Sequence, residues 1–291
     1  MTCSVVIDGV EIQYEDNGDG PPVVFVHGAY VTGSLWTPTV ANLAVDHRCI
    51  TPTWPFGAQA KPVGNNVDLG VLAAGQRIAR FLELLDLREV TLVANDTGGG
   101  VLLSALGAST LDLRRIAGIV LTNCDSYEHF PPRAFAPLVR VCRTSELAGR
   151  LVLRMLTTRR GITRFVDAVT LKGIEPLRYS DVFGGFLTSV SVRRDAVRFT
   201  AGLDPRYTLA ATQAIKDCSV PVLIVWGAND PMFPVSHAER LVRAFPRASM
   251  RIVQESRTYV MVDQPEATAD AIRAVTRSQS EPDRAPLEET Q

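Results

Sequence analysis

The residue with the strongest chemical signal is Asp96, which lies between an apolar run and a run of glycines. Val90–Ala94 predicts a buried strand, and a helix begins at Gly98 with almost no loop between them. The backbone of the central residue of so sharp a turn is strained, and the residues two positions before and after it must be small. Ala94 and Gly98 meet this requirement when Asp96 is the central residue. The pattern predicts a carboxylate displayed at a helix N-terminus, able to act as a nucleophile or as a general acid or base. An Asp that only caps the helix is the alternative.

A second motif, His-Gly-Ala-Tyr at residues 27–30, also follows an apolar strand-like run. A glycine turn here points the amide of Ala29 into the same cleft, where it would form an oxyanion hole with the amide of Thr97. A histidine in such a turn usually holds the loop by hydrogen bonds. We nevertheless count His27, together with Tyr30, among the candidate substrate contacts.

A third motif places Asp230 just after the apolar run Val222–Trp226. The functional groups of α/β enzymes lie outside the carboxyl ends of sheet strands, so Asp230 is a second candidate catalytic carboxylate. The alternative is that Asp230 caps the helix-like stretch that follows it.

The segments that carry these motifs alternate between strand-like and helix-like runs, which predicts an α/β fold with helices on both faces of a mostly parallel, eight-stranded sheet. The predicted strands are Ser4–Ile7, Val10–Gln13, Val23–Val26, Cys49–Thr51, Val90–Ala94, Ile116–Thr122, Val222–Trp226 and Ser249–Val253. The predicted helices between them are Leu72–Leu84, Gly98–Ala108 and Pro265–Arg277.

One stretch, 126–205, breaks this alternation and contains short amphipathic helices such as Leu147–Leu156 and Ile162–Leu171. We expect it to form a helical cap, or lid, inserted between two parts of the core at 1–125 and 206–278. The polar composition of 279–291 predicts a disordered tail.

Composition narrows the function classes. The 291 residues carry a formal net charge of −1, which argues against a nucleic-acid partner, and no apolar run is long enough for a membrane span. The N-terminus resembles no export signal, and the five cysteines include no CxxC pair. We therefore expect a cytoplasmic protein with no disulfide framework, no metal site and no cofactor. Arginine far outnumbers lysine, a weak hint of a GC-rich bacterial genome.

The order of these motifs, from about Val5 to about Arg277, resembles the α/β-hydrolase fold. An Asp at the elbow resembles the branch that contains haloalkane dehalogenases and epoxide hydrolases. In that branch the carboxylate attacks carbon to give an ester, which a histidine-activated water hydrolyses. Residues 121–125, which precede the predicted cap, are also similar to that branch and add Asn123 to the candidate substrate contacts.

The chain departs from this family at the base. The resemblance implies a catalytic His on the loop after the last strand, but Thr258 stands at that position and is followed by Tyr259, another candidate substrate contact. A Thr hydroxyl cannot act as a general base near neutral pH. None of the four histidines lies on this loop, so His129, where the predicted cap leaves the sheet, is the candidate stand-in base.

Parts needed for particular substrates also differ. Dehalogenases hold the halide with a Trp after the nucleophile, where this chain has Thr97, and some add an Asn where it has Ala29. Dehalogenation is therefore not expected. Epoxide hydrolases hold the ring oxygen with two lid tyrosines, for which the candidates are Tyr127, Tyr179 and Tyr207.

Three hypotheses for function stay open, each with a small-molecule substrate or ligand. The first is a hydrolase that acts on a small, mostly apolar ester, lactone or epoxide through Asp96 with an unconventional base. The second is a lyase, isomerase or cyclase in which Asp96 is a general acid or base. The third is a catalytically dead ligand-binding protein, for which the resemblance offers hormone receptors of this fold that lack the His. A homodimer is also left open.

Overall fold

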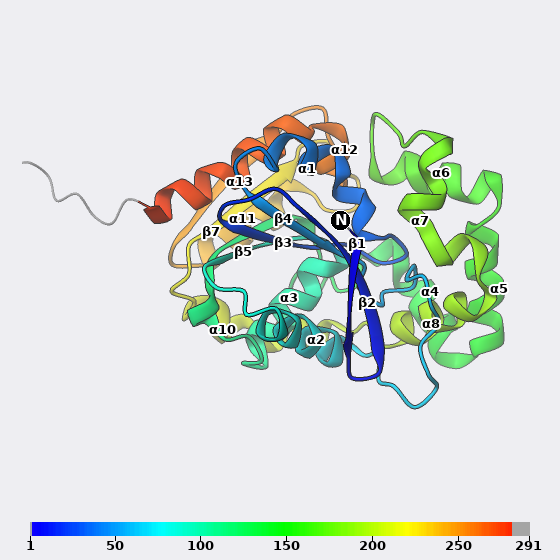
Figure 1. Ribbon diagram of the computed structural model, residues 1–291. Helices are drawn as coiled ribbons and strands as arrows, with labels where there is room; N and C mark the ends of the chain where they lie inside the picture. Colours follow the sequence, from blue (N-terminus) through cyan, green and yellow to red (C-terminus); the bar gives the residue numbers. More distant parts are fainter. Residues whose placement is uncertain (1, 281–291) are drawn as a thin grey trace, which may run out of the picture.

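The computed structural model describes residues 2–280, and an eight-stranded sheet forms its centre (Figure 1). The strand order is β1-β2-β4-β3-β5-β6-β7-β8, with β1 antiparallel to β2, β2 antiparallel to β4, and the remaining pairs parallel. The strands are β1 (Thr2–Ile7), β2 (Val10–Asn17), β3 (Pro22–Val26), β4 (Arg48–Pro52), β5 (Val90–Asp96), β6 (Ile116–Cys124), β7 (Val222–Gly227) and β8 (Ala248–Val253). The predicted eight-stranded, mostly parallel sheet is confirmed.

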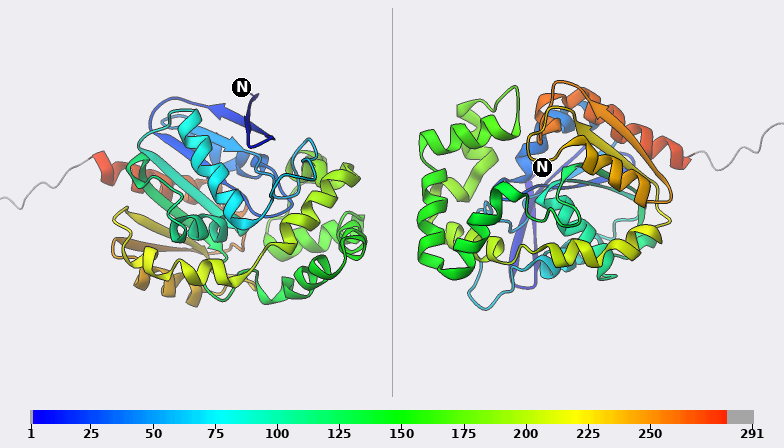
Figure 2. Two further views of the ribbon diagram at one scale, coloured as in Figure 1. Left: turned by 90° about the horizontal axis from the view of Figure 1, so that it is seen from below. Right: turned by 180° about the vertical axis from the view of Figure 1, so that it is seen from behind.

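Helices cover both faces of this sheet. Helices α1 and α13 lie over one face, and α2 and α3 lie over the other (Figures 1 and 2). The core helices are α1 (Thr37–Leu43), α2 (Val71–Leu84), α3 (Thr97–Gly107), α9 (Pro205–Ala210), α10 (Thr212–Lys216), α11 (Val235–Ala244), α12 (Val260–Asp263) and α13 (Pro265–Ser280). Short 3₁₀ helices are η1 (Gly33–Trp36), η2 (Leu113–Arg115), η3 (Arg133–Phe135) and η4 (Pro176–Arg178). Helix α13 runs past the predicted start of the tail, and residues 281–291 lie outside the described part of the chain.

The central strands are apolar without interruption because both of their faces are covered. In β5, Leu92 and Ala94 belong to the core cluster that contains α2 and α3, whereas Val93 belongs to the cluster that contains α1 and α13. Successive side chains of a strand point to opposite faces, so each apolar residue of β5 has a core to enter. This double burial fixes the carboxyl end of β5, where the chain must turn sharply into α3.

The helices between β6 and α9 form a separate layer at one end of the sheet, drawn mostly in green in Figure 1. We call α4 to α8 the outer layer. It comprises α4 (Ala136–Thr144), α5 (Glu146–Leu156), α6 (Arg159–Val169), α7 (Tyr179–Thr188) and α8 (Val190–Ala201). Backbone hydrogen bonds from Thr32 to Val182 (2.8 Å) and from Gly185 to Ala58 (3.0 Å) join α7 to the loops of the core. The outer layer is thus hydrogen-bonded to loops at the carboxyl ends of β3 and β4.

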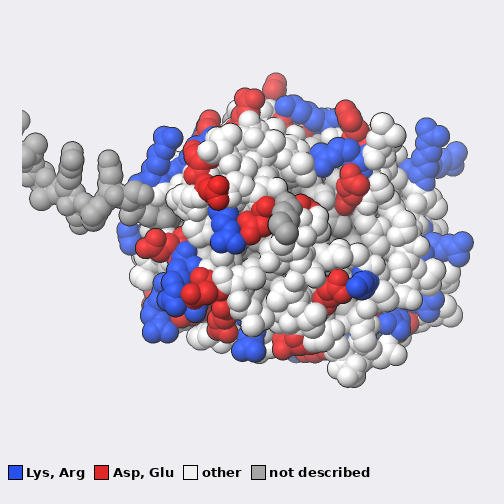
Figure 3. All heavy atoms as spheres, in the orientation of Figure 1, with Lys and Arg blue, Asp and Glu red and all other residues white. Residues whose placement is uncertain are grey.

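The surface shows no large area of a single charge on the face in Figure 3, where acidic and basic side chains are interspersed. Within residues 2–280, no helix is both long enough and apolar enough to cross a membrane.

Candidate active site

Asp96 lies at the turn where β5 ends and α3 begins. Its φ of 52° and ψ of −130° are unusual for a residue with a side chain and cost about 1–3 kcal/mol. The turn also needs two glycines. A Cβ on Gly98 would lie 2.5 Å from the carbonyl oxygen of His27, and a Cβ on Gly28 would lie 2.1 Å from Oδ2 of Asp96. The backbone geometry and the close packing of this turn therefore display the Asp96 carboxyl as the spacing of the sequence predicts.

Two backbone amides hold the Asp96 carboxyl. The amides of Ala29 and Thr97, the predicted oxyanion hole, both donate hydrogen bonds to the carboxylate itself. The pKa of Asp96 is raised to about 7, mainly by burial and then by the charge of Asp230. The hydrogen bonds from the two amides act in the opposite direction and lower it. The carboxyl is partly exposed to a pocket that Ala29 and Thr97 also line. Asp96 is thus held in place by two donors and keeps contact with the space above it.

Asp230 follows β7 and accepts four hydrogen bonds. Its Oδ1 accepts from the amides of Met232 (2.8 Å) and Phe233 (3.1 Å), so it closes the turn after the strand and does not cap α11, which begins at Val235. Its Oδ2 accepts from Nδ2 of Asn123 (2.9 Å) and from Oγ1 of Thr258 (2.8 Å). Burial raises the pKa of Asp230 in spite of these donors.

The hydrogen bond between Thr258 and Asp230 joins the loop after β8 to the loop after β7. Thr258 is fully buried, and its hydroxyl donates to Asp230 from the position where the resemblance to the Asp-nucleophile branch implies a His. Asn123, predicted to touch substrate, instead donates to Asp230 and to the carbonyl of Gly227 (3.3 Å). It does not line the pocket at Asp96.

Asn95 is a positioning residue that the sequence analysis did not identify. Its Nδ2 donates to the carbonyl of Thr258 (2.8 Å) and to the hydroxyl of Thr122 (2.9 Å), so it joins β5, β6 and the loop that carries Thr258. The signal in the sequence was an amide side chain at the end of a mostly apolar strand, because buried polar groups usually find hydrogen-bond partners.

His27 holds the loop after β3. Its Nδ1 lies 2.8 Å from the carbonyl of Gly28, and its Nε2 accepts the amide proton of Trp54 (2.8 Å). Burial lowers the pKa of His27 to about 4, so the ring is neutral near pH 7. With both ring nitrogens bonded to backbone and no exposed surface, His27 is not available for a substrate in this structure.

The pocket at Asp96 is small and mostly apolar. Its free volume is about 20 Å³, room for about one water molecule. Tyr30 lines it from a positive φ of 64°, with its hydroxyl 2.5 Å from the Thr200 hydroxyl. Tyr259 does not line the pocket, but its ring centroid lies 6.5 Å from that of Phe165, which does, and its buried hydroxyl has no hydrogen-bond partner. The remaining lining residues are Pro131, Pro132, Phe135, Val139, Phe165 and Leu203.

Other candidates lie outside this pocket. His129 stacks on His237, with ring centroids 4.2 Å apart, and does not line the pocket. Tyr127, Tyr179 and Tyr207 do not line it either. The structure therefore brings neither the proposed stand-in base nor a pair of lid tyrosines to Asp96.

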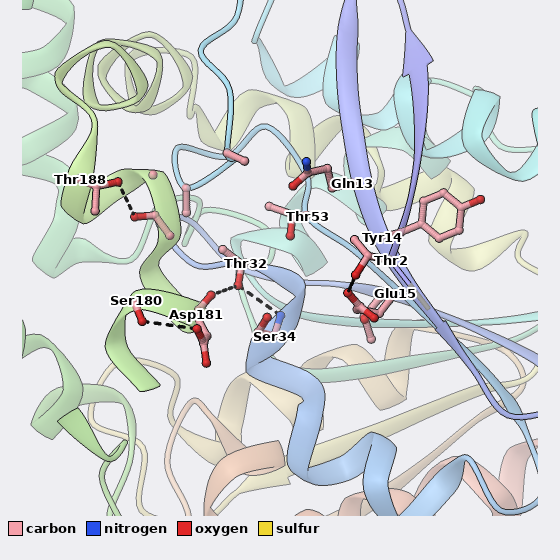
Figure 4. Close-up of a pocket in the computed structure, with 15 residues that line it drawn as sticks. Thr2, Gln13, Tyr14, Glu15, Thr32, Ser34, Thr53, Ser180, Asp181 and Thr188 are labelled. Carbon is pink, nitrogen blue, oxygen red and sulfur yellow. Dashed lines mark hydrogen bonds between the residues drawn. The ribbon is translucent and has the colours of Figure 1, made fainter. Parts of the chain in front are cut away.

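A larger groove lies elsewhere, between the β1–β2 hairpin and α7 (Figure 4). Its volume is about 400 Å³, and hydroxyl-bearing side chains such as Thr32, Ser180 and Thr188 line it. Asp96 and Asp230 are not among its lining residues. We therefore place the candidate active site at the smaller pocket, which holds the displayed carboxyl.

Comparisons with known proteins agree with this fold. A curated relative, the cis-3-alkyl-4-alkyloxetan-2-one decarboxylase of Shewanella oneidensis, is 26% identical over 271 residues, which cover 88% of this chain and 82% of the relative. Haloalkane dehalogenase 2 of Mycobacterium tuberculosis is 25% identical over 272 residues, which cover 90% of each chain.

Solved structures are similar over nearly the whole chain. The haloalkane dehalogenase of Bradyrhizobium elkani superposes with a TM-score of 0.76 at 15% identity, covering 96% of this chain and 99% of that one. An esterase of Thermogutta terrifontis gives a TM-score of 0.74 at 19% identity, covering 97% and 100%. The family model described as "Alpha/beta hydrolase family" matches residues 23–271. Since this match spans most of the sheet, both carboxyl-bearing turns and the outer layer, the chain belongs to the alpha/beta hydrolase family.

Proposed function

We propose that this protein is an enzyme in which Asp96 attacks a carbon atom of a small, mostly apolar organic substrate and is released again without water. The observation that carries the proposal is the hydrogen bond from the Thr258 hydroxyl to Asp230, made where a hydrolase of this branch would need a basic side chain. We further propose that 126–205, which contains the outer layer, acts as the cap over this site.

The nucleophilic half of the machinery is supported by the geometry at Asp96. Its carboxyl is fixed by the amides of Ala29 and Thr97 and faces the pocket. Holding a nucleophile in one orientation next to its target lowers the barrier because the loss of orientational freedom has already occurred. Because burial raises the pKa of Asp96 to about 7, the share of the carboxyl in the ionised, nucleophilic form increases as the pH rises through the neutral range.

The geometry does not support a general base that would activate water to hydrolyse an ester on Asp96. The only hydroxyl proton of Thr258 is directed to Asp230, and a Thr hydroxyl does not take a proton from water near neutral pH. Loss of one member of a catalytic triad costs about 10⁴ in rate, so an ester on Asp96 would hydrolyse very slowly. The natural substrate must therefore free Asp96 by its own chemistry.

A strained lactone satisfies this requirement. The Asp96 carboxylate attacks the saturated ring carbon that is bonded to the ring oxygen, not the carbonyl carbon. This attack forms a C–O bond to Asp96, breaks the bond between that carbon and the ring oxygen, and leaves a free carboxylate on the substrate. Loss of that carboxylate as CO₂ gives its electron pair to a new C=C bond, and the bond to Asp96 breaks. The carboxylate of Asp96 is regenerated, and no proton or water is consumed. The decarboxylase from Shewanella, named for an oxetan-2-one, which is a β-lactone, supports this substrate class.

The pocket supports a small apolar substrate and requires the cap to move. The free volume of about 20 Å³ is too small for an organic molecule, and Phe135 and Phe165 of the cap region close the space over Asp96. Displacement of these side chains would admit the substrate and exclude bulk water once they return. The lid tyrosines that an epoxide would need do not line the pocket, which favours a lactone over an epoxide.

The proposal is tested by product analysis. Wild type and Asp96→Asn are incubated with a dialkyl β-lactone, a matched epoxide and a haloalkane, and the products are separated by gas chromatography. We expect wild type to convert the lactone to an alkene and CO₂, and Asp96→Asn to leave it unchanged. A hydroxy acid as the main product would show ordinary hydrolysis and overturn the proposal.

The pKa of about 7 favours a second candidate function, in which Asp96 acts as a general acid or base in a lyase, isomerase or cyclase. The two functions differ in the covalent step. Intact-protein mass spectrometry after rapid quenching would detect an ester on Asp96 only in the first case. Tight binding of these compounds with no turnover, unchanged in Asp96→Asn, would instead favour a ligand-binding protein.

A further inference from the structure

Helix α5 carries apolar side chains on a face that the core does not use. Leu147, Leu151 and Met155 are 65%, 56% and 67% exposed, respectively. They follow one another at intervals of four residues, so they form a stripe along one face of the helix. The opposite face packs against the rest of the outer layer, and there Leu153 is fully buried. The stripe therefore lies outside the hydrophobic core, and residues 2–280 leave it largely uncovered.

Two arginines of α5 flank this stripe. Arg150 and Arg154 follow Leu147 and Leu151 by three positions, which makes each pair neighbours on the helix surface. Arg150 lies 3.8 Å from the carboxylate of Glu146, an acidic residue on the same helix. Arg154 is exposed and forms no ion pair with any residue in the described part of the chain. The stripe therefore has a positively charged border on α5.

Helix α6 adds three arginines beside the end of α5. A Cβ on Gly161 would clash with the carbonyl oxygen of Met155, so the first turn of α6 packs directly against the last turn of α5. A surface hollow of about 440 Å³ is lined there by Arg159, Arg160 and Arg164. None of these three is ion-paired within residues 2–280. Basic side chains project at the edge of the molecule where Figure 1 places α5 and α6 (Figure 3).

We propose that this surface docks on an anionic lipid bilayer. The docking face consists of the apolar stripe of Leu147, Leu151 and Met155 and the five arginines of α5 and α6. An amphipathic helix with basic residues beside its apolar ones lies in the plane of a bilayer interface, with the apolar side chains at the acyl chains and the basic ones at the phosphates. Residues 146–164 fit this arrangement, because they carry five arginines, no lysine and one acidic residue. The proposal does not depend on the proposed chemistry of Asp96.

Charge favours a bilayer over a second copy of this chain. A two-fold symmetric contact between docking faces would place two sets of five arginines opposite each other, and like charges at close range repel. An anionic surface instead attracts every one of these side chains, by about 5-fold in affinity for each arginine near the surface.

The docking face is continuous with the apolar surroundings of the pocket at Asp96. Leu156, which follows Met155, lines a small apolar space together with Tyr30 and Phe165, and both of these residues also line the pocket. Docking would therefore hold α6, the helix of Phe165, against a bilayer, where small apolar molecules concentrate.

The test is co-sedimentation of the full chain with vesicles of phosphatidylcholine alone and of phosphatidylcholine mixed with phosphatidylglycerol. We expect wild type to bind the anionic vesicles at least about 10-fold more tightly than the neutral ones, and to bind them less as salt rises from about 0.1 M to about 0.5 M. Arg159→Gln, Arg160→Gln and Arg164→Gln together should weaken binding about 100-fold. Leu147→Gln with Leu151→Gln should weaken it about 10-fold or more, because the stripe then no longer enters the acyl region.

Matched controls make the same changes at the other end of the sheet. Arg88→Gln, Arg114→Gln and Arg247→Gln together remove three charges just before β5, β6 and β8. Val45→Gln with Leu84→Gln replaces two exposed apolar side chains of the core. Both control variants should bind vesicles as wild type does. Because every substituted side chain is exposed, circular dichroism should show that all the variants are folded.

The proposal fails if wild type binds neither kind of vesicle, binds both equally, or is matched by the docking-face variants. Light scattering without vesicles tests the other occupant. A wild-type dimer that Leu147→Gln with Leu151→Gln converts to a monomer would assign the face to a second copy of the chain and overturn the proposal. The proposed attack by Asp96 is judged separately, by product analysis.

Discussion

Replacing Asp96 with asparagine should stabilise the protein at alkaline pH while abolishing its proposed chemistry. Burial raises the pKa of Asp96 from the ordinary 3.8 to about 7, so ionising this carboxyl is harder in the folded protein than in the unfolded chain. Asparagine keeps the shape of the side chain and an oxygen that accepts from the amides of Ala29 and Thr97. It carries no charge at any pH, so it avoids the cost of a buried carboxylate.

The sign and the size of the effect follow from proton linkage. Below about pH 4 the carboxyl is protonated in both states, and between about pH 4 and pH 7 only the folded state keeps the proton, so stability falls as pH rises. Above about pH 7 both states are ionised, and the penalty is constant. A shift of about 3 pH units corresponds to about 4 kcal/mol at about 1.4 kcal/mol per unit. Because the carboxyl faces the pocket, we expect about 2–4 kcal/mol.

The assay is urea unfolding of wild type and Asp96→Asn at about pH 4.5 and about pH 8, where the linkage predicts a small and a large difference. A matched control is Asp263→Asn, since Asp263 is also fully buried. It should lower stability at both pH values, because the Asp263 carboxylate accepts four hydrogen bonds from Thr170, Leu171, Lys172 and Arg257. If Asp96→Asn is no more stable than wild type at the higher pH, the reasoning about a costly buried carboxylate is wrong.

Three further predictions concern single contacts of the site. Thr258→Val should lower the free energy of unfolding by about 1.5–3 kcal/mol in the same urea assay, since it removes a donor to the Asp230 carboxylate. The control Thr268→Val removes a buried hydroxyl that is bonded to neutral carbonyls, and it should cost about 0.5–1.5 kcal/mol. Thr258→His should shorten the lifetime of an ester on Asp96 by about 10³-fold or more, measured by mass spectrometry. An unchanged lifetime would argue against the claim that the ester persists because a base is missing at position 258. Gly28→Ala should slow alkylation of Asp96 by about 100-fold, because the new Cβ would lie 2.1 Å from Oδ2 and displace the carboxyl; an unaltered rate would show that this position is not the reactive one.

Much of the core fold could be predicted because its signals are local. All eight strands occur where apolar runs predicted them, and α3 begins at Thr97, one residue before the predicted Gly98. Strand β2 runs to Asn17, four residues beyond the predicted Gln13. Its last residues pair with β4, from Tyr14 opposite Pro52 to Asn17 opposite Cys49, and this pairing between distant segments leaves no mark in the local pattern.

The site divides in the same way. The turn at Asp96 could be predicted because a strand, a single residue and glycines in one short segment impose it. The hydrogen bond of Thr258 with Asp230 and the presence of Phe165 in the pocket lining depend on contacts between segments far apart in the chain.

The measurement that tests the central claim most directly is a single-turnover reaction of wild type with a β-lactone in water enriched in heavy oxygen. The peptide that carries Asp96 is then analysed by mass spectrometry, with Asp96→Asn as the control. We predict an ester on Asp96 that decays to alkene and CO₂, with no heavy oxygen entering the Asp96 carboxyl. Heavy oxygen in that carboxyl would show that water hydrolyses the ester and would contradict the account, as would equal turnover by Asp96→Asn.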